Sequence, residues 1–209
     1  ESLHISQIHQ LDRGFDFYAP QSFQDEQGRR ILIGWMGIPD ADYTNPTTED
    51  GWQHALTIPR ELHWKDGTLF QQPLSELKAL RKETLHFNEK SLCARQYDGE
   101  CYELETLFQH CEQMTLSLNE EIQITYQDHL FTLDITKCGY KRTTRSVYLD
   151  SLNNMRIFSD TSSLEIFLND GSEVFTTRIY PTRPRCVTLN TIEGDTKITL
   201  YPLTAHQVK

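Results

Sequence analysis

Short runs of alternating apolar and polar residues, separated by turn signals, constrain this chain more than any other feature. Among them are three sets, Met114, Leu116 and Leu118, then Ile122, Ile124 and Tyr126, then Phe131, Leu133 and Ile135. Side chains alternate between the two faces of a strand, so each run predicts a strand with one buried and one exposed face. About ten such runs at short spacing favour a β-sandwich from about Leu85 onward.

A hairpin is expected where the alternation of Leu164, Ile166 and Leu168 ends in Asn169-Asp170-Gly171. These turn residues tolerate positive φ, which explains Asp170 without a chemical role. Glu165 lies among the apolar residues of the run and is expected on its exposed face.

The first 74 residues predict a smaller set of strands. Ile31 to Ile33 form a continuous apolar run, and Asp66-Gly67 is a strong hairpin signal. Pro39 to Gly51 contains two prolines and predicts a long loop. Four short strands joined by tight turns are typical of one propeller blade. Residues 75–83 follow as a helical linker in which Ser75 caps the helix.

Composition excludes several classes of function. The chain of 209 residues is 37% hydrophobic and carries a net charge of −10, so it can bury a core but lacks the basic surface that nucleic acids need. The cluster of Lys141, Arg142 and Arg145 is interpreted as a solvated strand end. No stretch approaches the roughly twenty apolar residues of a membrane helix. The five cysteines form no CxxC pair, which favours free thiols in a reducing cytoplasm.

Four motifs carry a resemblance to a known family. They are Leu11-Asp12-Arg13-Gly14-Phe15-Asp16-Phe17-Tyr18-Ala19-Pro20-Gln21, then Ile33-Gly34-Trp35-Met36-Gly37, then Gly51-Trp52 with Leu56-Thr57-Ile58-Pro59-Arg60-Glu61-Leu62, and the hairpin from Arg156 to Pro181. In this order they resemble the later part of glycoside hydrolase family 32, which includes bacterial sucrose-6-phosphate hydrolases and invertases. The resemblance implies an all-β chain: the last blade of a five-bladed β-propeller at residues 1–74, the linker, and a C-terminal β-sandwich at residues 84–209.

The same resemblance identifies what this sequence lacks. Family members carry an Asn-Asp-Pro-Asn motif with the nucleophile, an Arg-Asp-Pro motif that holds the fructosyl ring, and a Glu-Cys motif whose glutamate is the acid/base. None occurs in the 209 residues, since the pair Glu100-Cys101 lacks the proline that should follow. We therefore expect the chain to be the C-terminal portion of a longer enzyme, to contain no catalytic residue, and to be inactive alone.

Asp16 and Tyr18 are the first candidates for substrate binding. The resemblance implies that they face the funnel for the fructosyl unit, with the tyrosine close to the acid/base glutamate. A phenol there can donate a hydrogen bond to a carboxylate and help to set its protonation state. Alternation along a strand would put both side chains on one face. The alternatives are a tyrosine packed in the blade core and an aspartate that supports the site from behind.

Trp35 and Trp52 are the other candidates, because sugars stack on aromatic faces and each tryptophan follows a glycine. Blade cores also use tryptophan, so a structural role is the alternative for both. Arg60-Glu61 is interpreted as a structural ion pair. Asp12 precedes a turn and is not expected to be a nucleophile. His54 lies nearest the expected funnel, but a solvated or core role is the default for the histidines. No metal or other cofactor is expected.

Two functions from different classes remain open. The first is part of a retaining glycosidase that cleaves the β-fructofuranosyl bond of sucrose 6-phosphate or sucrose. The second is a non-catalytic carbohydrate-binding or oligomerisation β-sandwich. For either, the expected partner is a small sugar and neither nucleic acid nor membrane. An isolated blade would expose apolar surface and strand edges, so we also expect either self-association through it or its partial disorder.

Overall fold

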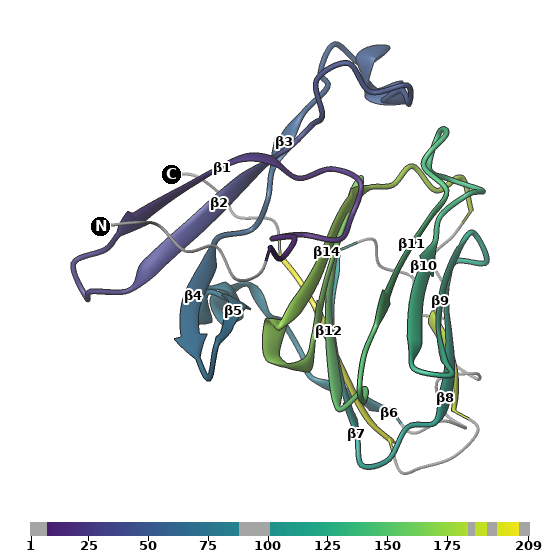
Figure 1. Cartoon of the computed structure of the whole chain (residues 1–209). Coiled ribbons are helices and arrows are strands. Elements are labelled where there is room, and N and C mark those ends of the chain that lie inside the picture. The colour runs from purple at the N-terminus through teal and green to yellow at the C-terminus, as the bar shows by residue number, and fades with distance from the viewer. Residues whose placement is uncertain (1–7, 88–100, 184–186, 192–195, 205–209) are drawn as a thin grey trace.

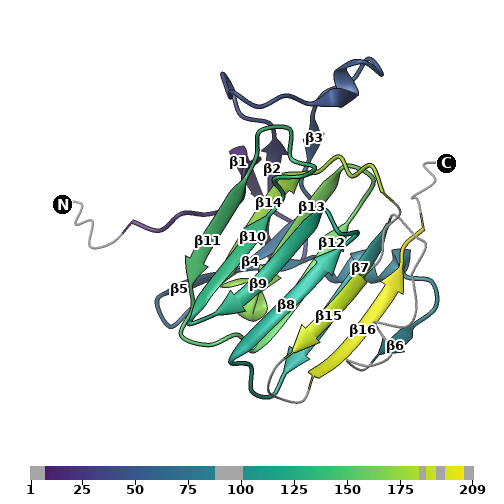
Figure 2. The same ribbon diagram turned by 90° about the vertical axis from the view of Figure 1, so that its right-hand side faces the viewer.

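The structure, a computed structural model, describes residues 8–87, 101–183, 187–191 and 196–204. These residues form three antiparallel sheets and three short 3-10 helices (Figures 1 and 2). The expected all-β class is confirmed.

The first sheet is built by the N-terminal third of the chain. Its order is β1-β2-β4-β5, with β3 pairing with β2. The strands are β1 (Tyr18–Gln24), β2 (Arg30–Met36), β3 (Ala55–Leu56), β4 (Arg60–Lys65) and β5 (Thr68–Pro73). The predicted hairpin at Asp66-Gly67 is confirmed: both residues have positive φ, and β4 pairs with β5 across them. The predicted long loop joins β2 to β3 and contains the 3-10 helix η1 (Pro46–Thr48).

The rest of the described chain forms two larger sheets. The second sheet has the order β11-β10-β9-β8-β15 and the third β14-β13-β12-β7-β16-β6. The strands are β6 (Leu85–Phe87), β7 (Tyr102–Phe108), β8 (Gln113–Leu118), β9 (Ile122–Gln127), β10 (Leu130–Asp134), β11 (Thr144–Tyr148), β12 (Asn154–Ser159), β13 (Ser163–Leu168), β14 (Glu173–Arg178), β15 (Val187–Thr191) and β16 (Thr196–Pro202). Figure 2 shows the second sheet in front of the third.

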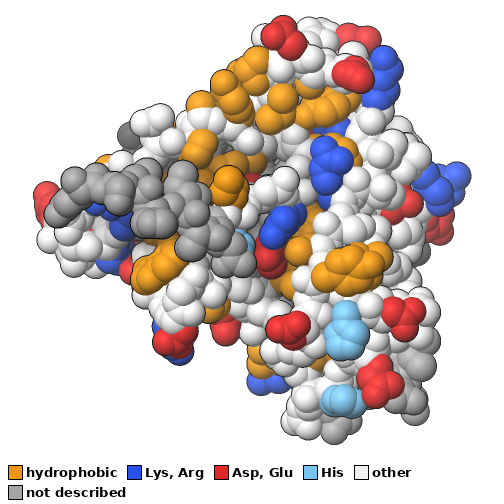
Figure 3. Space-filling model, viewed as in Figure 1, with side chains coloured by type: hydrophobic (Ala, Val, Ile, Leu, Met, Phe, Trp, Pro, Cys, Tyr) orange, Lys and Arg blue, Asp and Glu red, His pale blue; other side chains and the backbone are white. Residues whose placement is uncertain are grey.

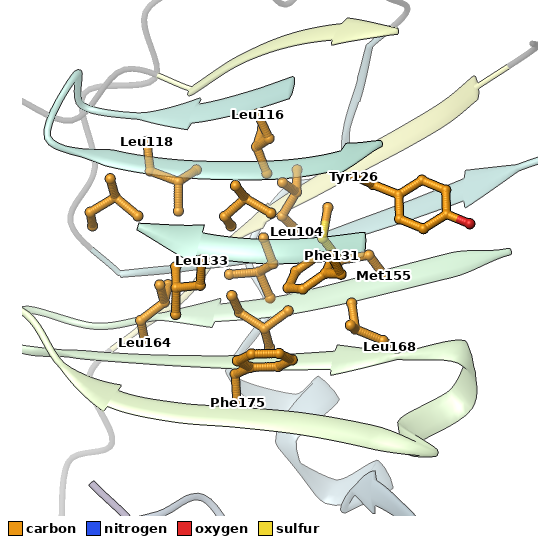
Figure 4. Packing of buried hydrophobic residues seen from close by; sticks show 14 of the residues in the cluster. Leu104, Leu116, Leu118, Tyr126, Phe131, Leu133, Met155, Leu164, Leu168 and Phe175 are labelled. Atoms are coloured by element: carbon orange, nitrogen blue, oxygen red, sulfur yellow. The ribbon is translucent and has the colours of Figure 1, made fainter. Parts of the chain in front are cut away.

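The main hydrophobic core lies between these two sheets. The residues whose alternation predicted strands point into it from both sides, as Leu116, Phe131, Leu164 and Phe175 do in Figure 4. Each of these four side chains is fully buried. The predicted alternation is thus confirmed, because one face of each sheet meets the other sheet. The turn η3 (Asn169–Gly171) lies where it was expected, with positive φ at all three residues.

Buried polar contacts join the first sheet to the outer face of the third. The Arg60 guanidinium is fully buried and donates hydrogen bonds to Asp12 (3.1 Å) and Glu165 (2.7 Å). Glu165 also accepts a hydrogen bond from the Ile58 amide at 2.8 Å. A small apolar cluster beside this network contains Phe158. Ion pairs and apolar contacts together therefore hold the first sheet against the third.

This network corrects two expectations. Arg60 pairs with Asp12 and Glu165, and Glu61 instead lies 3.4 Å from His63. Glu165 is buried, not exposed, since the first sheet covers the face of β13 that carries it. Alternation showed which residues share a face but not that another sheet covers that face.

The predicted linker helix differs in type. It is a 3-10 helix, η2 (Ser75–Leu80), and the residue before its first turn is Leu74. Ser75 makes no capping hydrogen bond, and its hydroxyl instead contacts Glu76.

Within the described residues, none of the helices has the length and apolar character needed to cross a bilayer. Cys111 is a free thiol, and Cys93 and Cys186 lie outside the described residues.

Candidate sugar-binding site

Three aromatic rings lie in a row where the first sheet meets the long loop. Tyr18 opens β1 and pairs across the sheet with Trp35 of β2, with ring centroids 6.0 Å apart. The ring of Trp35 also lies 4.7 Å from the ring of His54, which directly precedes β3. Tyr18 is 48% exposed and His54 is exposed, so the row is open to solvent. The alternative of a tyrosine packed in the core is therefore wrong.

Gly37 permits the close packing of this row. A Cβ atom at this position would lie 2.6 Å from His54 Nδ1 and 2.8 Å from the indole of Trp35. A larger residue would push the two rings apart. The close packing of the two rings thus explains the glycine at position 37.

A cavity of about 250 Å³ lies beside the row. The residues that line it include Trp35, His54, Asp16, Tyr43, Asn45 and Arg142. Hydrophobic side chains also gather over the projecting loop at the top of Figure 3. A small polar cavity next to exposed aromatic faces suits a sugar, which offers both hydroxyl groups and apolar C–H patches.

Asp16 lines the same cavity and is fully buried. Oδ1 accepts from Arg142 Nη2 at 2.7 Å, and Oδ2 accepts from Arg142 Nε at 2.7 Å and from the Arg178 amide at 2.8 Å. The Thr177 hydroxyl donates a further bond to Oδ2 at 3.2 Å. Asp16 precedes β1 in a bend, so the alternation that was expected to put it on the face of Tyr18 does not apply to it.

Tyr43 forms another part of the cavity wall. Its hydroxyl donates a 2.6 Å hydrogen bond to the Phe15 carbonyl, and the Arg142 guanidinium carbon lies 4.1 Å from its ring centroid. Burial, and then the negative charge of Asp16, raise the pKa of Tyr43 to about 12. The phenol therefore remains protonated at neutral pH and keeps this hydrogen bond.

Trp52 is not brought together with Trp35. It follows η1 in the long loop, is 44% exposed, and covers the buried guanidinium of Arg178 at 5.0 Å from its ring centroid. The structure thus brings Trp35 into contact with Tyr18 and lines one cavity with Trp35 and Asp16, while Trp52 lies over a separate buried arginine. Among the described residues, no three His, Cys, Asp or Glu side chains are arranged to bind a metal ion.

Two residues of the cavity were not expected there. His54 was assigned a solvated or core role, and Arg142 was interpreted as part of a solvated strand end, which is wrong because it is fully buried. Their partners lie far away in sequence: Arg142 is 126 residues from Asp16. In the sequence, only the position of His54 beside the Gly51-Trp52 motif indicated that this histidine lies near the expected site.

Comparison with known proteins identifies the family. Residues 1–73 match the model described as glycosyl hydrolases family 32 N-terminal domain, and residues 76–207 match the family 32 C-terminal model. The chain is 43% identical over 198 residues to the sucrose-6-phosphate hydrolase of Staphylococcus xylosus, covering 86% of this chain and 40% of that protein. It is 38% identical over 180 residues to the enzyme of the same name from Klebsiella pneumoniae, covering 85% and 37%. The chain therefore spans about two fifths of the length of these relatives.

Solved structures agree. The sucrose-6-phosphate hydrolase of Lactobacillus gasseri superposes with a TM-score of 0.82 at 27% identity, over 93% of this chain and 42% of that one. A β-fructofuranosidase of Bombyx mori superposes with a TM-score of 0.72 at 25% identity over the same shares, and one structure of that enzyme contains sucrose. The resemblance seen in the sequence motifs is confirmed, and the chain belongs to glycosyl hydrolases family 32.

Proposed function

We propose that this chain forms part of a retaining β-fructofuranosidase that acts on sucrose 6-phosphate or sucrose. In this proposal residues 1–74 are the last blade of a five-bladed propeller, residues 75–83 link it onward, and residues 84–209 are a C-terminal β-sandwich. The four antiparallel strands β1, β2, β4 and β5 and the face-to-face packing of the two larger sheets support this division. The names of the relatives support the substrate class.

The reaction itself needs two carboxyl groups. One attacks the anomeric carbon, and the other first protonates the leaving oxygen and then activates water. The sequence motifs that carry these groups in the family do not occur in these 209 residues. The chain alone is therefore inactive in this proposal, and it contributes one wall of the sugar site.

The open aromatic row is the observation that carries this role. Tyr18 presents a solvent-exposed phenol at the first residue of β1, and Trp35 supports it from the neighbouring strand. Tyr18 donates a hydrogen bond to the acid/base carboxyl, and Trp35 offers an apolar face to the sugar. Asp16 supports the site from behind, since its oxygens are already bound by Arg142 and by main-chain and hydroxyl donors. Trp52 shapes the rim of the site through the long loop.

A chimera tests the proposal. The 198-residue segment of the Staphylococcus xylosus enzyme that matches this chain is replaced by this chain, and hydrolysis of sucrose 6-phosphate and sucrose is measured. The chimera is expected to hydrolyse at least one of these sugars, and the 209-residue chain alone neither. Turnover by the purified chain alone would contradict the proposal, as would a folded chimera without activity.

In this chimera, Tyr18→Phe removes only the phenolic oxygen. Loss of a hydrogen bond to a charged group costs about 1.5–3 kcal/mol, so kcat/KM is expected to fall roughly 10- to 100-fold. The alkaline limb of the pH profile of kcat/KM should move as well, because the phenol helps to set the protonation state of the carboxyl that acts as the general acid. Tyr148→Phe is the matched control, since Tyr148 is an exposed tyrosine on β11 of the second sheet. Equal kinetics for the Tyr18 variant and the parent chimera would show that Tyr18 has no role in the site.

The alternative function is a carbohydrate-binding or oligomerisation module without turnover. Titration of the 209-residue chain with fructose, inulin and levan, followed by tryptophan fluorescence, separates the two proposals. A binding module gives saturable binding of a fructan by the chain alone, and an inactive chimera. If the chain instead forms one wall of a fructosidase site, the chimera is active.

A further inference from the structure

Arg142 lies in the loop between β10 and β11, in the second sheet, yet its guanidinium reaches the cavity beside Trp35. Its loop is compact: Ile135 donates a main-chain bond to Thr143 O at 2.9 Å, and a Cβ at Gly139 would lie 2.4 Å from Arg142 O. Tyr140 and Lys141 adopt positive φ just before the arginine. The local chain is thus shaped to point one buried cation away from its own sheet.

All five N–H groups of this guanidinium are used. Nε and Nη2 hold the two oxygens of Asp16, each at 2.7 Å, and Nη2 also donates to Asn45 Oδ1 at 2.8 Å. Nη1 donates to the carbonyls of Thr44 and Gly139, both at 3.1 Å. A guanidinium has five donors and no acceptor, so none remains for a ligand. Arg142 therefore acts on the cavity through its partners and not by contact with a sugar.

Those partners are parts of the cavity wall. Asn45 and Tyr43 lie in the loop that leaves β2 just after Trp35 and returns at His54. Two further bonds tie the same part of the loop to the larger sheets: Tyr180 donates to Asn45 Oδ1 at 2.9 Å, and Thr44 N donates to Tyr140 O at 3.4 Å. We propose that Arg142 is a positioning residue through which the second sheet sets the conformation of the long loop and the charge at the candidate sugar site.

The charge is the part of this role that ordinary packing would not share. The titratable and charged groups on the cavity walls are Asp16, Asp40, Tyr43, His54 and Arg142. With Arg142 present, the Asp16 carboxylate is neutralised by a bidentate pair. Without it, the buried Asp16 side chain keeps only uncharged donors, the Thr177 hydroxyl and the Arg178 amide. A cation at position 142 should therefore matter beyond the space that the side chain fills.

The experiment uses the 209-residue chain with Arg142→Gln, Arg142→Lys and, as matched control, Arg145→Gln. Arg145 is exposed three residues further on, its hydrogen bonds reach only main-chain carbonyls at 3.3 Å or more, and its guanidinium carbon lies 3.9 Å from the ring centroid of Phe15. Hydrogen exchange by mass spectrometry follows residues 38–54.

In Arg142→Gln we expect exchange in residues 38–54 to be roughly tenfold faster or more. Arg142→Lys keeps the charge but has three donors, so it should restore part of the exchange protection. Arg145→Gln should match the wild type. Exchange in residues 38–54 as slow as in the wild type, or an Arg142→Lys variant no better protected than Arg142→Gln, overturns the proposal.

Asn45→Ala decides the matter if Arg142→Gln does not fold. It removes the loop's side-chain bonds to Arg142 and to Tyr180 and leaves the Asp16 pair intact, so Tyr180→Phe, which removes only the second bond, is its control. Faster exchange confined to the loop supports the proposal, and unchanged exchange overturns it. The inference rests on the proposed sugar site, but the exchange measurement needs no sugar. An inactive chimera beside the expected exchange would overturn the proposed function alone.

Discussion

Buried charged residues carry the contacts between parts of this chain that lie far apart in sequence. Arg60 joins Asp12, 48 residues away, and Glu165, 105 residues away, and Arg142 joins Asp16, 126 residues away. Each arginine is fully buried and bound by several acceptors. A buried ion pair contributes little net stability over an apolar replacement of the whole set, but removal of one partner leaves an uncompensated charge. Single substitutions at these residues are therefore expected to lower the free energy of unfolding strongly.

Arg60→Met tests this at the first network. Asp12 and Glu165 would lose their shared cation in a buried place, so the free energy of unfolding is expected to fall by about 3–5 kcal/mol. Urea denaturation measures the change. Arg30→Met is the control, since Arg30 is exposed at the start of β2 and should change stability by about 0.5 kcal/mol or less. Similar losses in both variants would contradict the special role of the Arg60 network.

The same network predicts a pH dependence. Burial raises the pKa of Glu165 above its ordinary 4.5, outweighing the opposite effect of Arg60. Above about pH 4.5 the folded protein then holds more protons at this carboxyl than the unfolded chain does, so rising pH lowers stability until the folded pKa is passed. Carboxyls such as Glu76, whose pKa the Arg29 pair lowers to about 2, act in the opposite direction.

Glu165→Gln isolates this contribution because the amide does not titrate. The free energy of unfolding of the wild type minus that of the variant is expected to decrease as the pH rises from about 4 to 7. Chemical denaturation at several pH values gives this difference. An increase over the same range would mean that the folded pKa of Glu165 lies below 4.5.

At the level of secondary-structure elements, the turns differ in what surrounds them. Gly67 in the β4–β5 hairpin and Gly171 in η3 both have positive φ, of 79° and 84°. Around Gly67 there is open space, whereas a Cβ at Gly171 would lie 1.9 Å from the carbonyl oxygen of Gln71 in β5. The first glycine serves only its own turn, and the second also lets the third sheet approach the first.

Alanine at these two positions separates the effects. Gly67→Ala is expected to cost about 1–2 kcal/mol for the left-handed backbone alone. Gly171→Ala adds the clash with β5, for a further loss of about 1–3 kcal/mol. Thermal and urea unfolding measure both. Equal losses would show that β5 can move away from η3 without cost.

At the scale of the whole molecule, the strands differ in how much of their surface other parts of the chain cover. No residue of β1 is buried, and among the described strands only β2 pairs with it (Figure 1). Phe23 on this strand is 52% exposed. A strand with two open faces and an open edge is a ready surface for another chain. The two larger sheets, in contrast, cover each other's apolar faces.

We therefore expect the 209-residue chain to associate with itself through β1. Sedimentation equilibrium should give a mass that rises with concentration, and Phe23→Lys should shift it toward the monomer because edge charges oppose strand pairing. Tyr148→Lys is the control, since Tyr148 is 76% exposed on β11, the edge of the second sheet. A monomer at all concentrations, or an equal effect of the control, would contradict association through β1.

The sequence by itself determined the β class, most strand positions, the hairpins at Asp66-Gly67 and Asn169-Gly171, and the family. These follow from local rules, since the alternation of side chains and the tolerance for positive φ depend only on neighbouring residues. It also indicated Tyr18 and Trp35, which neighbouring strands bring together. Only the tertiary structure decided that Arg60, Arg142 and Glu165 are buried and that His54 joins the aromatic row. A charged residue is buried when distant segments supply its partners, and no local pattern records that pairing.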